Sequence, residues 1–488
     1  MNQRGFTNTF LPFISSDRRP LFLFIIFFAI SIQLIAFLLL FGGISFTKVL
    51  LVLIGIPLLI YLLFSVENFF IVIVIYISCF HMGGYHEVFR GFVPFGVEWR
   101  HLYTLYTLLI VYWIFSTFLK RRKIKITPLG YSIIVFSSIS LLSFVHGLIN
   151  GYFQNVRKIF ISDIFPPLMY LTYFIFITSN LSNMKKRIFF DFILVASVFI
   201  GLQLLYAFRQ NGISTFTRIN TNTVQISLLA FPYVLGILYF TKSLRRKLIS
   251  VLALIPISFS VLISLQRSLW LALIIVFVFS LFTLFYKRGF SFKKILGLSL
   301  GGILGFLFVI LIAVFVLSKI TSGAAILVLL KRFISLVSIA HLRVDASAYT
   351  RLTEIKQALS KIVGIQWLIG RGIGDTFYSF LRTKTKVYLD NSYAWVLWKM
   401  GIVGLISFLA MFFVFFHRVV ILIRKNLEVE DTIYIMTISL NMLGVMICSL
   451  GNASLVKFRY IIIWAVSMAI MDVIYSKYKN ENTANLLK

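Results

Sequence analysis

Residues 389–405 read LDNSYAWVLWKMGIVGL and begin an apolar run that continues to about residue 416. An apolar stretch of about 20 residues is long enough to cross a bilayer as a helix. Similar stretches recur along the whole chain, in which 60% of the 488 residues are hydrophobic and only 13% are charged. A soluble protein carries about twice that charged fraction. The sequence therefore predicts an all-α polytopic membrane protein, folded as a single helical bundle over residues 1–488.

The pattern of apolar runs predicts fourteen membrane spans. They lie near residues 21–43, 48–64, 67–82, 101–119, 129–148, 164–181, 188–208, 223–241, 248–265, 268–286, 295–318, 393–416, 431–451 and 459–475. Basic clusters occupy every second short loop, and these clusters are 120–125, 185–187, 242–247, 287–294 and 417–425. Since basic residues mark cytoplasmic loops, this alternation predicts that both termini are cytoplasmic. The formal net charge of +32 is distributed in the same way and forms no single stripe, so no nucleic-acid partner is expected.

One large loop on the outer side, about residues 319–392, precedes the last three spans. Between residues 319 and 391 it carries eleven basic and four acidic side chains, a difference of +7. This charge fits a solvated basic loop or a site for an anionic substrate. Within the loop, apolar residues at helical spacing predict an amphipathic helix that packs on the bundle or lies at the membrane interface. They are Leu352, Ile355, Leu359, Ile362 and Val363.

The sequence GRGIGD at residues 370–375 follows that predicted helix. A dinucleotide-binding fingerprint lies between a strand and a helix, so we interpret GRGIGD as a flexible turn.

Four arginines on the outer side are candidate ligands for phosphate. Arg267 interrupts the apolar run SLQRSLWLAL, where a charge is costly and predicts function, although a snorkelling anchor is the alternative. Arg218 precedes a span, and a solvated loop arginine is its alternative. Arg351 lies three residues before Glu354, with which it could form a purely structural pair. With Arg371 they predict a site that neutralises a pyrophosphate leaving group, because guanidinium groups bind phosphate through two hydrogen bonds.

The opening stretch supplies the remaining candidates. Asp390, at a helix start, is suited to act as a general base, or it is only a helix cap. Asn391 beside it is a predicted substrate-binding residue. Lys399 lies inside the apolar run and requires a partner or a watery cavity. We expect a cavity that leads toward lipid phosphates. The six histidines show no ligand spacing, so neither a metal nor another cofactor is expected.

Four segments between about residues 216 and 405 resemble the O-antigen ligase / O-antigen polymerase superfamily in their order and placement. They are the Arg218 segment with Asn220 and Pro232, the run SLQRSLWLAL, the run RLTEIKQALSKIVGIQWLIGRGIGDTF, and the opening stretch with Gly401 and Gly404. The family consists of GT-C glycosyltransferases that move glycans from undecaprenyl pyrophosphate at the outer face of the bacterial plasma membrane, without a metal.

The resemblance implies that Arg267 and Arg351 hold the pyrophosphate, with Arg218 as a third arginine. Many members, ligases especially, have histidine where this chain has Asp390, which favours a polymerase of lipid-linked repeat units over a ligase. The expected partners are lipid-linked oligosaccharides and membrane lipids, with a flippase and a chain-length regulator as candidate protein partners. A transporter of lipid-linked sugars is the alternative from another class, but it predicts two repeat halves, and none is visible.

Overall fold

The computed structural model describes residues 110, 113–114, 117–118, 124–152, 163–178, 181–211, 223–264, 266–287, 293, 297, 346–456 and 458–486. Five predicted spans lie wholly or mostly outside these residues: 21–43, 48–64, 67–82, 101–119 and 295–318. Arg218 and the first part of the large outer loop also lie outside them. The predicted total of fourteen spans therefore stays a prediction.

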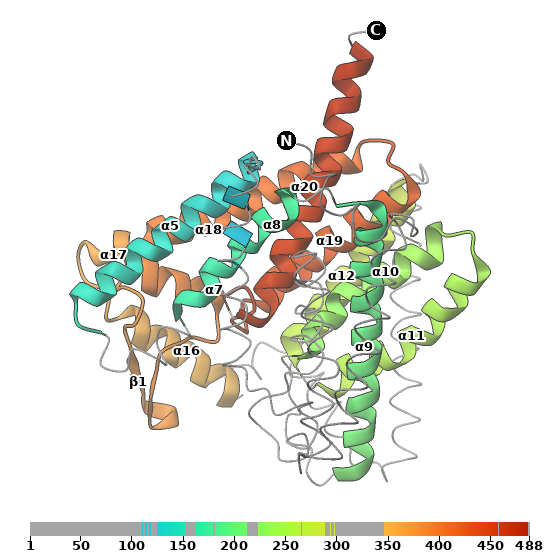
Figure 1. The fold of residues 1–488 in the computed structure, drawn as a ribbon. Coiled ribbons are helices and arrows are strands. Elements are labelled where there is room, and N and C mark those ends of the chain that lie inside the picture. Colours follow the sequence, from blue (N-terminus) through green and yellow to red (C-terminus); the bar gives the residue numbers. More distant parts are fainter. Residues whose placement is uncertain are drawn as a thin grey trace, which may run out of the picture.

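The described residues form helices, with one small two-stranded sheet (Figure 1). The helices are α5 Pro128–Ile149, α7 Phe165–Leu168, η4 Met169–Leu171, α8 Thr172–Thr178, α9 Asn183–Asn211, η5 Thr223–Ile226, α10 Ser227–Phe240, α11 Leu244–Ile263, α12 Arg267–Lys287, α16 Ala346–Leu359, α17 Gln366–Ile369, η6 Phe380–Arg382, α18 Ser392–Ile423, α19 Val429–Cys448 and α20 Phe458–Leu486. The strands β1 Phe377–Ser379 and β2 Lys384–Lys386 pair antiparallel, with Phe377 opposite Lys386.

Four of the described helices are long and apolar enough to cross a membrane. They are α5, α18, α19 and the part of α20 from Tyr460 to Lys479. Three shorter apolar helical segments accompany them, at Phe165–Thr178, Val224–Phe240 and Arg267–Thr283. The predicted all-α membrane architecture is therefore confirmed for the described part of the chain.

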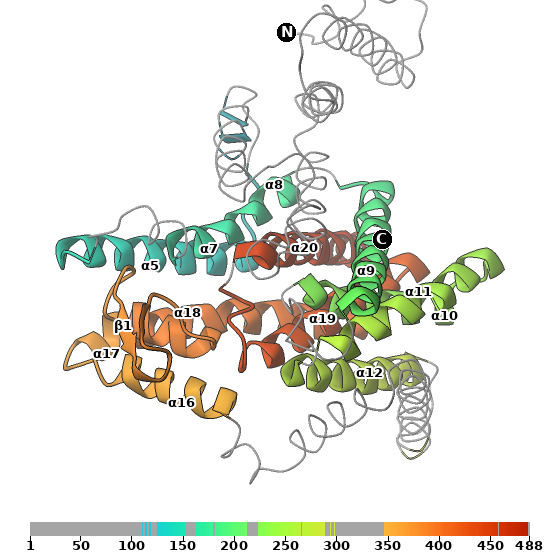
Figure 2. The same cartoon turned by 90° about the horizontal axis from the view of Figure 1, so that it is seen from below.

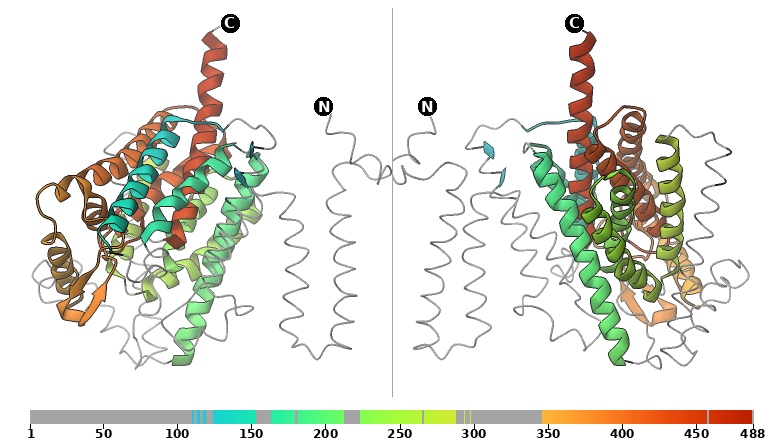
Figure 3. Two further views of the ribbon diagram at one scale, coloured as in Figure 1. Left: turned by 60° about the vertical axis from the view of Figure 1, so that its left-hand side comes forward. Right: turned by 90° about the vertical axis from the view of Figure 1, so that its right-hand side faces the viewer.

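The helices gather in two groups around α19 and α20 (Figures 1 and 2). One group contains α5, α16, α17, α18 and the hairpin, and the other contains α9, α10, α11 and α12. Helix α10 packs on α19 and on α11, while α18 packs along α5. The C-terminal end of α20 extends beyond the other described helices (Figure 3).

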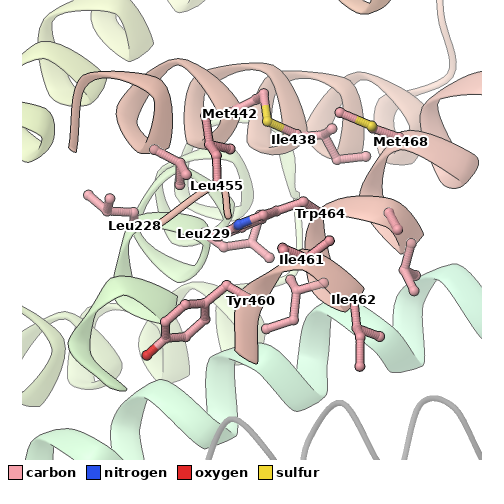
Figure 4. Packing of buried hydrophobic residues seen from close by; sticks show 14 of the residues in the cluster. Leu228, Leu229, Ile438, Met442, Leu455, Tyr460, Ile461, Ile462, Trp464 and Met468 are labelled. Carbon is pink, nitrogen blue, oxygen red and sulfur yellow. The ribbon is translucent and has the colours of Figure 1, made fainter. Parts of the chain in front are cut away.

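The centre of the bundle is apolar and closely packed around α20. Trp464 is fully buried and is surrounded by side chains of α10 and α19, with Leu229 and Met442 among them (Figure 4). Every residue from 460 to 472 is buried. Helix α20 is thus enclosed by its neighbours over most of its length, whereas α5 and α18 each leave one apolar face exposed.

At one end of the bundle, ion pairs and hydrogen bonds join the ends of several helices. Lys186 of α9 lies 2.8 Å from Asp431 of α19, and Lys477 of α20 lies 3.1 Å from the same carboxylate. Nearby, Thr127 caps α5 and also donates to Asp472 of α20 at 2.5 Å. The ends joined here are those that the alternating basic loops place on one side.

The opposite end of the bundle joins the other set of helix ends. The amide of Ser392 donates to the carbonyl of Ser449 at 3.0 Å, and Leu455 donates to the Ser392 hydroxyl at 3.2 Å. The start of α18 is thereby held against the turn between α19 and α20. The described spans alternate in direction, as the predicted topology requires.

Helix α18 bends at Gly401, where the backbone leaves the helical conformation with φ of 68°. The loop 370–373 fills the bend: Arg371 and Gly372 donate their amides to the carbonyls of Trp398 and Lys399, at 2.9 and 3.0 Å. Ile373 donates in turn to Ser143 of α5. The segment GRGIGD is therefore a turn, as predicted, but it is a packed turn that joins α5 to α18 rather than a flexible one.

Candidate functional site

Four chain segments that are distant in sequence meet around Asp390. The Oδ2 atom of Asp390 lies 3.8 Å from Nε of Arg351 on α16. A β-carbon placed at Gly451, in the turn between α19 and α20, would lie 3.7 Å from Nη1 of Arg351 and 3.3 Å from Cβ of Ser268. Ser268 follows Arg267 at the start of α12, so the predicted Arg267, Arg351 and Asp390 all lie at this end of the bundle. We call this cluster the Asp390 site.

Arg382 is a member of the Asp390 site that was not predicted from the sequence. Its Nη2 atom lies 3.5 Å from Oδ2 of Asp390, and its Nε atom lies 3.1 Å from Oε1 of Glu354. The chain returns Arg382 to Asp390 by a tight turn at Thr383, which has φ of 47°. In the sequence, the basic run LRTKTK indicates only a charged loop. The contact between Arg382 and Asp390 depends on the turn at Thr383, which the sequence does not reveal.

Glu354 fixes the hairpin on α16. Its side chain is 1% exposed, and it accepts hydrogen bonds from Lys386 and from Ser379, both at 2.7 Å. The structural pair between Arg351 and Glu354, considered above, is therefore not what the structure shows. Glu354 pairs with the hairpin, and Arg351 on the same helix is directed to Asp390.

The amphipathic pattern of the outer loop is realised differently from the prediction. Helix α16 ends at Leu359 and a separate short helix, α17, follows. Leu352 and Val363 are exposed, whereas the buried side of this region consists of Glu354, Ala358 and Ile362. Of the five apolar residues of the predicted helix, Ile355, Leu359 and Ile362 pack against the core, whereas Leu352 and Val363 are exposed because Glu354 turns α16 toward the hairpin.

Asn391, rather than Asp390, caps α18. Its Oδ1 atom accepts from the amide of Ala394 at 2.8 Å, and its Nδ2 atom donates to the carbonyl of Leu450 at 2.8 Å. The capping role that the sequence left open for Asp390 is thus filled by its neighbour. Asp390 is left with its carboxylate directed to the two arginines, while substrate binding by Asn391 stays a prediction.

Lys399 lies outside the Asp390 site. It is fully buried, and its Nζ atom lies 2.8 Å from Oδ2 of Asp163, which is also fully buried. It also donates to the carbonyl of Asp375 and lies 4.0 Å from the centre of the Trp398 ring. The predicted watery cavity is wrong, because a partner 236 residues earlier in the chain neutralises the charge. Lys399 is therefore held in a buried ion pair, and its substrate-binding role stays a prediction.

Arg371 belongs to a second cluster, centred on Asp375. Its Nε atom lies 3.2 Å from Oδ2 of Asp375, and its guanidinium lies 5.6 Å from the ring centre of Tyr152. Lys361 also contacts Asp375 at 3.2 Å. Burial is the largest influence on the Tyr152 phenol and raises its pKa, although Arg371 lowers it. The structure thus separates Arg371 from the residues with which the sequence grouped it.

The contacts of Asp390 with Arg351 and Arg382 are long for ion pairs. Two guanidinium groups approach Asp390 at 3.5 and 3.8 Å, which is longer than the roughly 2.7–2.9 Å of a charge-assisted hydrogen bond. Among the described residues, no acceptor receives a hydrogen bond from the buried Nε atom of Arg351. Within the same part of the chain, no three His, Cys, Asp or Glu residues are placed to hold a metal ion. The side chains that meet at the Asp390 site are a carboxylate and positively charged guanidinium groups.

Comparison with known proteins adds no assignment. No protein-family model matches the chain, and no curated protein matches it significantly.

Proposed function

We propose that the chain is a glycosyltransferase of the bacterial plasma membrane, which polymerises oligosaccharide repeat units carried on undecaprenyl pyrophosphate. The observation that carries the proposal is the contact of Asp390 with Arg351 and Arg382, beside the start of α12. This cluster lies at the end of the bundle opposite Lys186 and Asp431, which is the outer end in the predicted topology. The family resemblance described above supports the same assignment.

The proposed reaction is the displacement of a pyrophosphate by a sugar hydroxyl. The acceptor hydroxyl oxygen forms a bond to the anomeric carbon of the donor, and the bond between that carbon and the pyrophosphate oxygen breaks. Asp390 takes the hydroxyl proton as general base. Arg267 and Arg351 bind the pyrophosphate, whose negative charge increases as the bond breaks. Arg218 is a further proposed phosphate ligand, and it lies outside the described residues.

The ion pairs seen around Asp390 fit this sequence of events. A bound pyrophosphate competes for the guanidinium groups of Arg351 and Arg382, since it offers two-pronged hydrogen bonds that a carboxylate at 3.5–3.8 Å does not receive. Phosphate binding would then release Asp390 from its positive neighbours. The donor itself thereby prepares the base for the acceptor hydroxyl.

Asp390 also underlies the choice of a polymerase over a ligase, because it stands where ligase-like members of the resembled family often have histidine. A deletion strain separates the two activities. Single repeat units left on the lipid carrier indicate a polymerase, whereas full chains left on the carrier indicate a ligase.

The decisive variant is Asp390→Asn, assayed in proteoliposomes with purified lipid-linked repeat units. Asparagine keeps the shape of the side chain but accepts no proton, so polymer formation is expected to fall by about 10²- to 10⁴-fold while donor binding persists. The matched control is Asp191→Asn, a half-exposed carboxylate at the opposite end of the bundle. A normal rate in the Asp390→Asn protein would remove the catalytic role.

A further inference from the structure

The segment 363–369, which includes α17, exposes a run of apolar side chains on the outer loop. Val363 and Ile365 are 70% and 71% exposed, and Trp367, Leu368 and Ile369 are each more than 40% exposed. No charged residue occurs between Lys361 and Arg371. We propose that this segment is inserted into the outer leaflet of the bilayer and that lipid is its partner. The inference does not depend on the proposed reaction.

Most backbone amides of this segment are paired within the protein, as a lipid environment favours, although among the described residues the amides of Gly364 and Ile365 show no such hydrogen bond. From residue 366 to residue 375, every amide donates a hydrogen bond to another group of the protein. The Val363 amide donates to the side chain of Gln366 at 3.2 Å. Lipid offers no partner to a free amide, so irregular backbone is tolerated there only when its polar groups are paired internally. A turn in water could leave several of these amides to solvent.

The exposed surface is continuous with the lipid-facing side of a membrane span. Helix α17 packs on α18, and a β-carbon at Gly401 would lie 2.2 Å from the carbonyl oxygen of Leu368. Directly beyond the bend, α18 exposes Ile402, Val403 and Ile406. The apolar side chains of α17 therefore extend the same face toward the outer end.

The lengths of α18 and α5 place the outer edge of the hydrocarbon core near the bend of α18. Counted back from the basic cluster 417–425, residues 397–416 of α18 span about 30 Å at 1.5 Å per residue, the thickness of a hydrocarbon core. Residues 128–147 of α5 span about 30 Å by the same rule. Gly147 contacts Gly372, at the bend of α18, because a β-carbon at Gly372 would lie 2.8 Å from the Gly147 amide nitrogen. Two helices thus give the same boundary, and α17 lies beside it.

Spin labelling tests the location directly. A nitroxide is attached at Leu368 in a protein whose two native cysteines are replaced by alanine, and the protein is reconstituted into phosphatidylethanolamine–phosphatidylglycerol vesicles. Collision rates are measured with oxygen, which concentrates in lipid, and with a water-soluble nickel chelate. The matched controls are labels at Val403, on the lipid-facing side of α18, and at Lys384, on the hairpin.

A label at Leu368 is expected to resemble Val403, with frequent oxygen collisions and protection from nickel. Nickel access equal to that at Lys384 would place the segment in water and overturn the proposal. Protection from both reagents would mean that protein, such as a second copy of the chain, covers the segment. That result would also overturn the proposal. If the Leu368 variant does not fold, Ile365 provides the second labelling site, because its side chain is more exposed.

Discussion

The substitution Lys399→Met tests how the outer loop is attached to the bundle. Lys399 and Asp163 are each 0% exposed and lie 2.8 Å apart, so removing the lysine leaves a buried carboxylate without its counter-charge. Breaking a buried pair in this way typically costs about 3–5 kcal/mol. Among the described residues, Asp163 then keeps only the hydrogen bond from the amide of Gly374, at 3.3 Å. A loss of stability of this size is therefore expected for Lys399→Met.

The assay is thermal unfolding of the purified protein in detergent, followed by fluorescence-detected size-exclusion chromatography. The matched control is Lys361→Met, because Lys361 also contacts a carboxylate, Asp375, but is 36% exposed. A pair with such an exposed member contributes roughly 0–1 kcal/mol. The double variant Lys399→Met with Asp163→Leu is expected to recover most of the lost stability, since replacing both charges by apolar groups is often neutral or stabilising.

Equal stability of the Lys399→Met and Lys361→Met proteins would refute the buried pair. Loss of polymer formation in a fully stable Lys399→Met protein would instead support the predicted substrate-binding role of Lys399.

Two further substitutions test other contacts. Gly401→Ala places a β-carbon 2.2 Å from the carbonyl oxygen of Leu368 at a φ of 68°, so its cost is expected to exceed the roughly 1–2 kcal/mol of the backbone strain alone. The thermal assay checks this against Gly364→Ala, where φ is also positive but the space is open, and equal losses would contradict the close packing. Arg267→Ala is expected to lower polymer formation by about 10- to 150-fold, the equivalent of about 1.5–3 kcal/mol, through a lost charge-assisted contact to pyrophosphate. Arg267→Lys should recover only part of that rate, and full activity of the alanine protein would make Arg267 a membrane anchor.

The general architecture could be predicted because its signals are local in sequence. The length of each apolar run predicts a span, and the basic loops between runs predict its direction. The same local reasoning considered a cap at the start of α18, but it named only Asp390 for that role, whereas Asn391 fills it. The orientation of the Asn391 side chain as a cap is supported by its hydrogen bond to the carbonyl of Leu450. Leu450 follows α19 and is distant from Asn391 in sequence.

The errors concern contacts between distant parts of the chain. Lys399 is separated from Asp163 by 236 residues, and no sequence pattern connects them. The buried side of α16 was misjudged for a related reason. Apolar spacing favoured Leu352, whereas the hairpin supplies Lys386 and Ser379 to Glu354 and makes burial of that carboxylate favourable.

The outer loop has a larger part in the Asp390 site than its two arginines suggest. The segment 392–400 of α18 is a short helix held at both ends: Ser392 bonds to the turn between α19 and α20, and the carbonyls of Trp398 and Lys399 receive the amides of the loop 370–373. That loop belongs to the same chain segment that carries Arg351 and Arg382. One segment therefore supplies Arg351 and Arg382 and also fixes the helix whose start carries Asp390. Close passage of this segment over the bend requires glycine at Gly370, where a β-carbon would lie 2.3 Å from the Lys399 carbonyl group. The geometry of the site consequently depends on glycines that are not part of it.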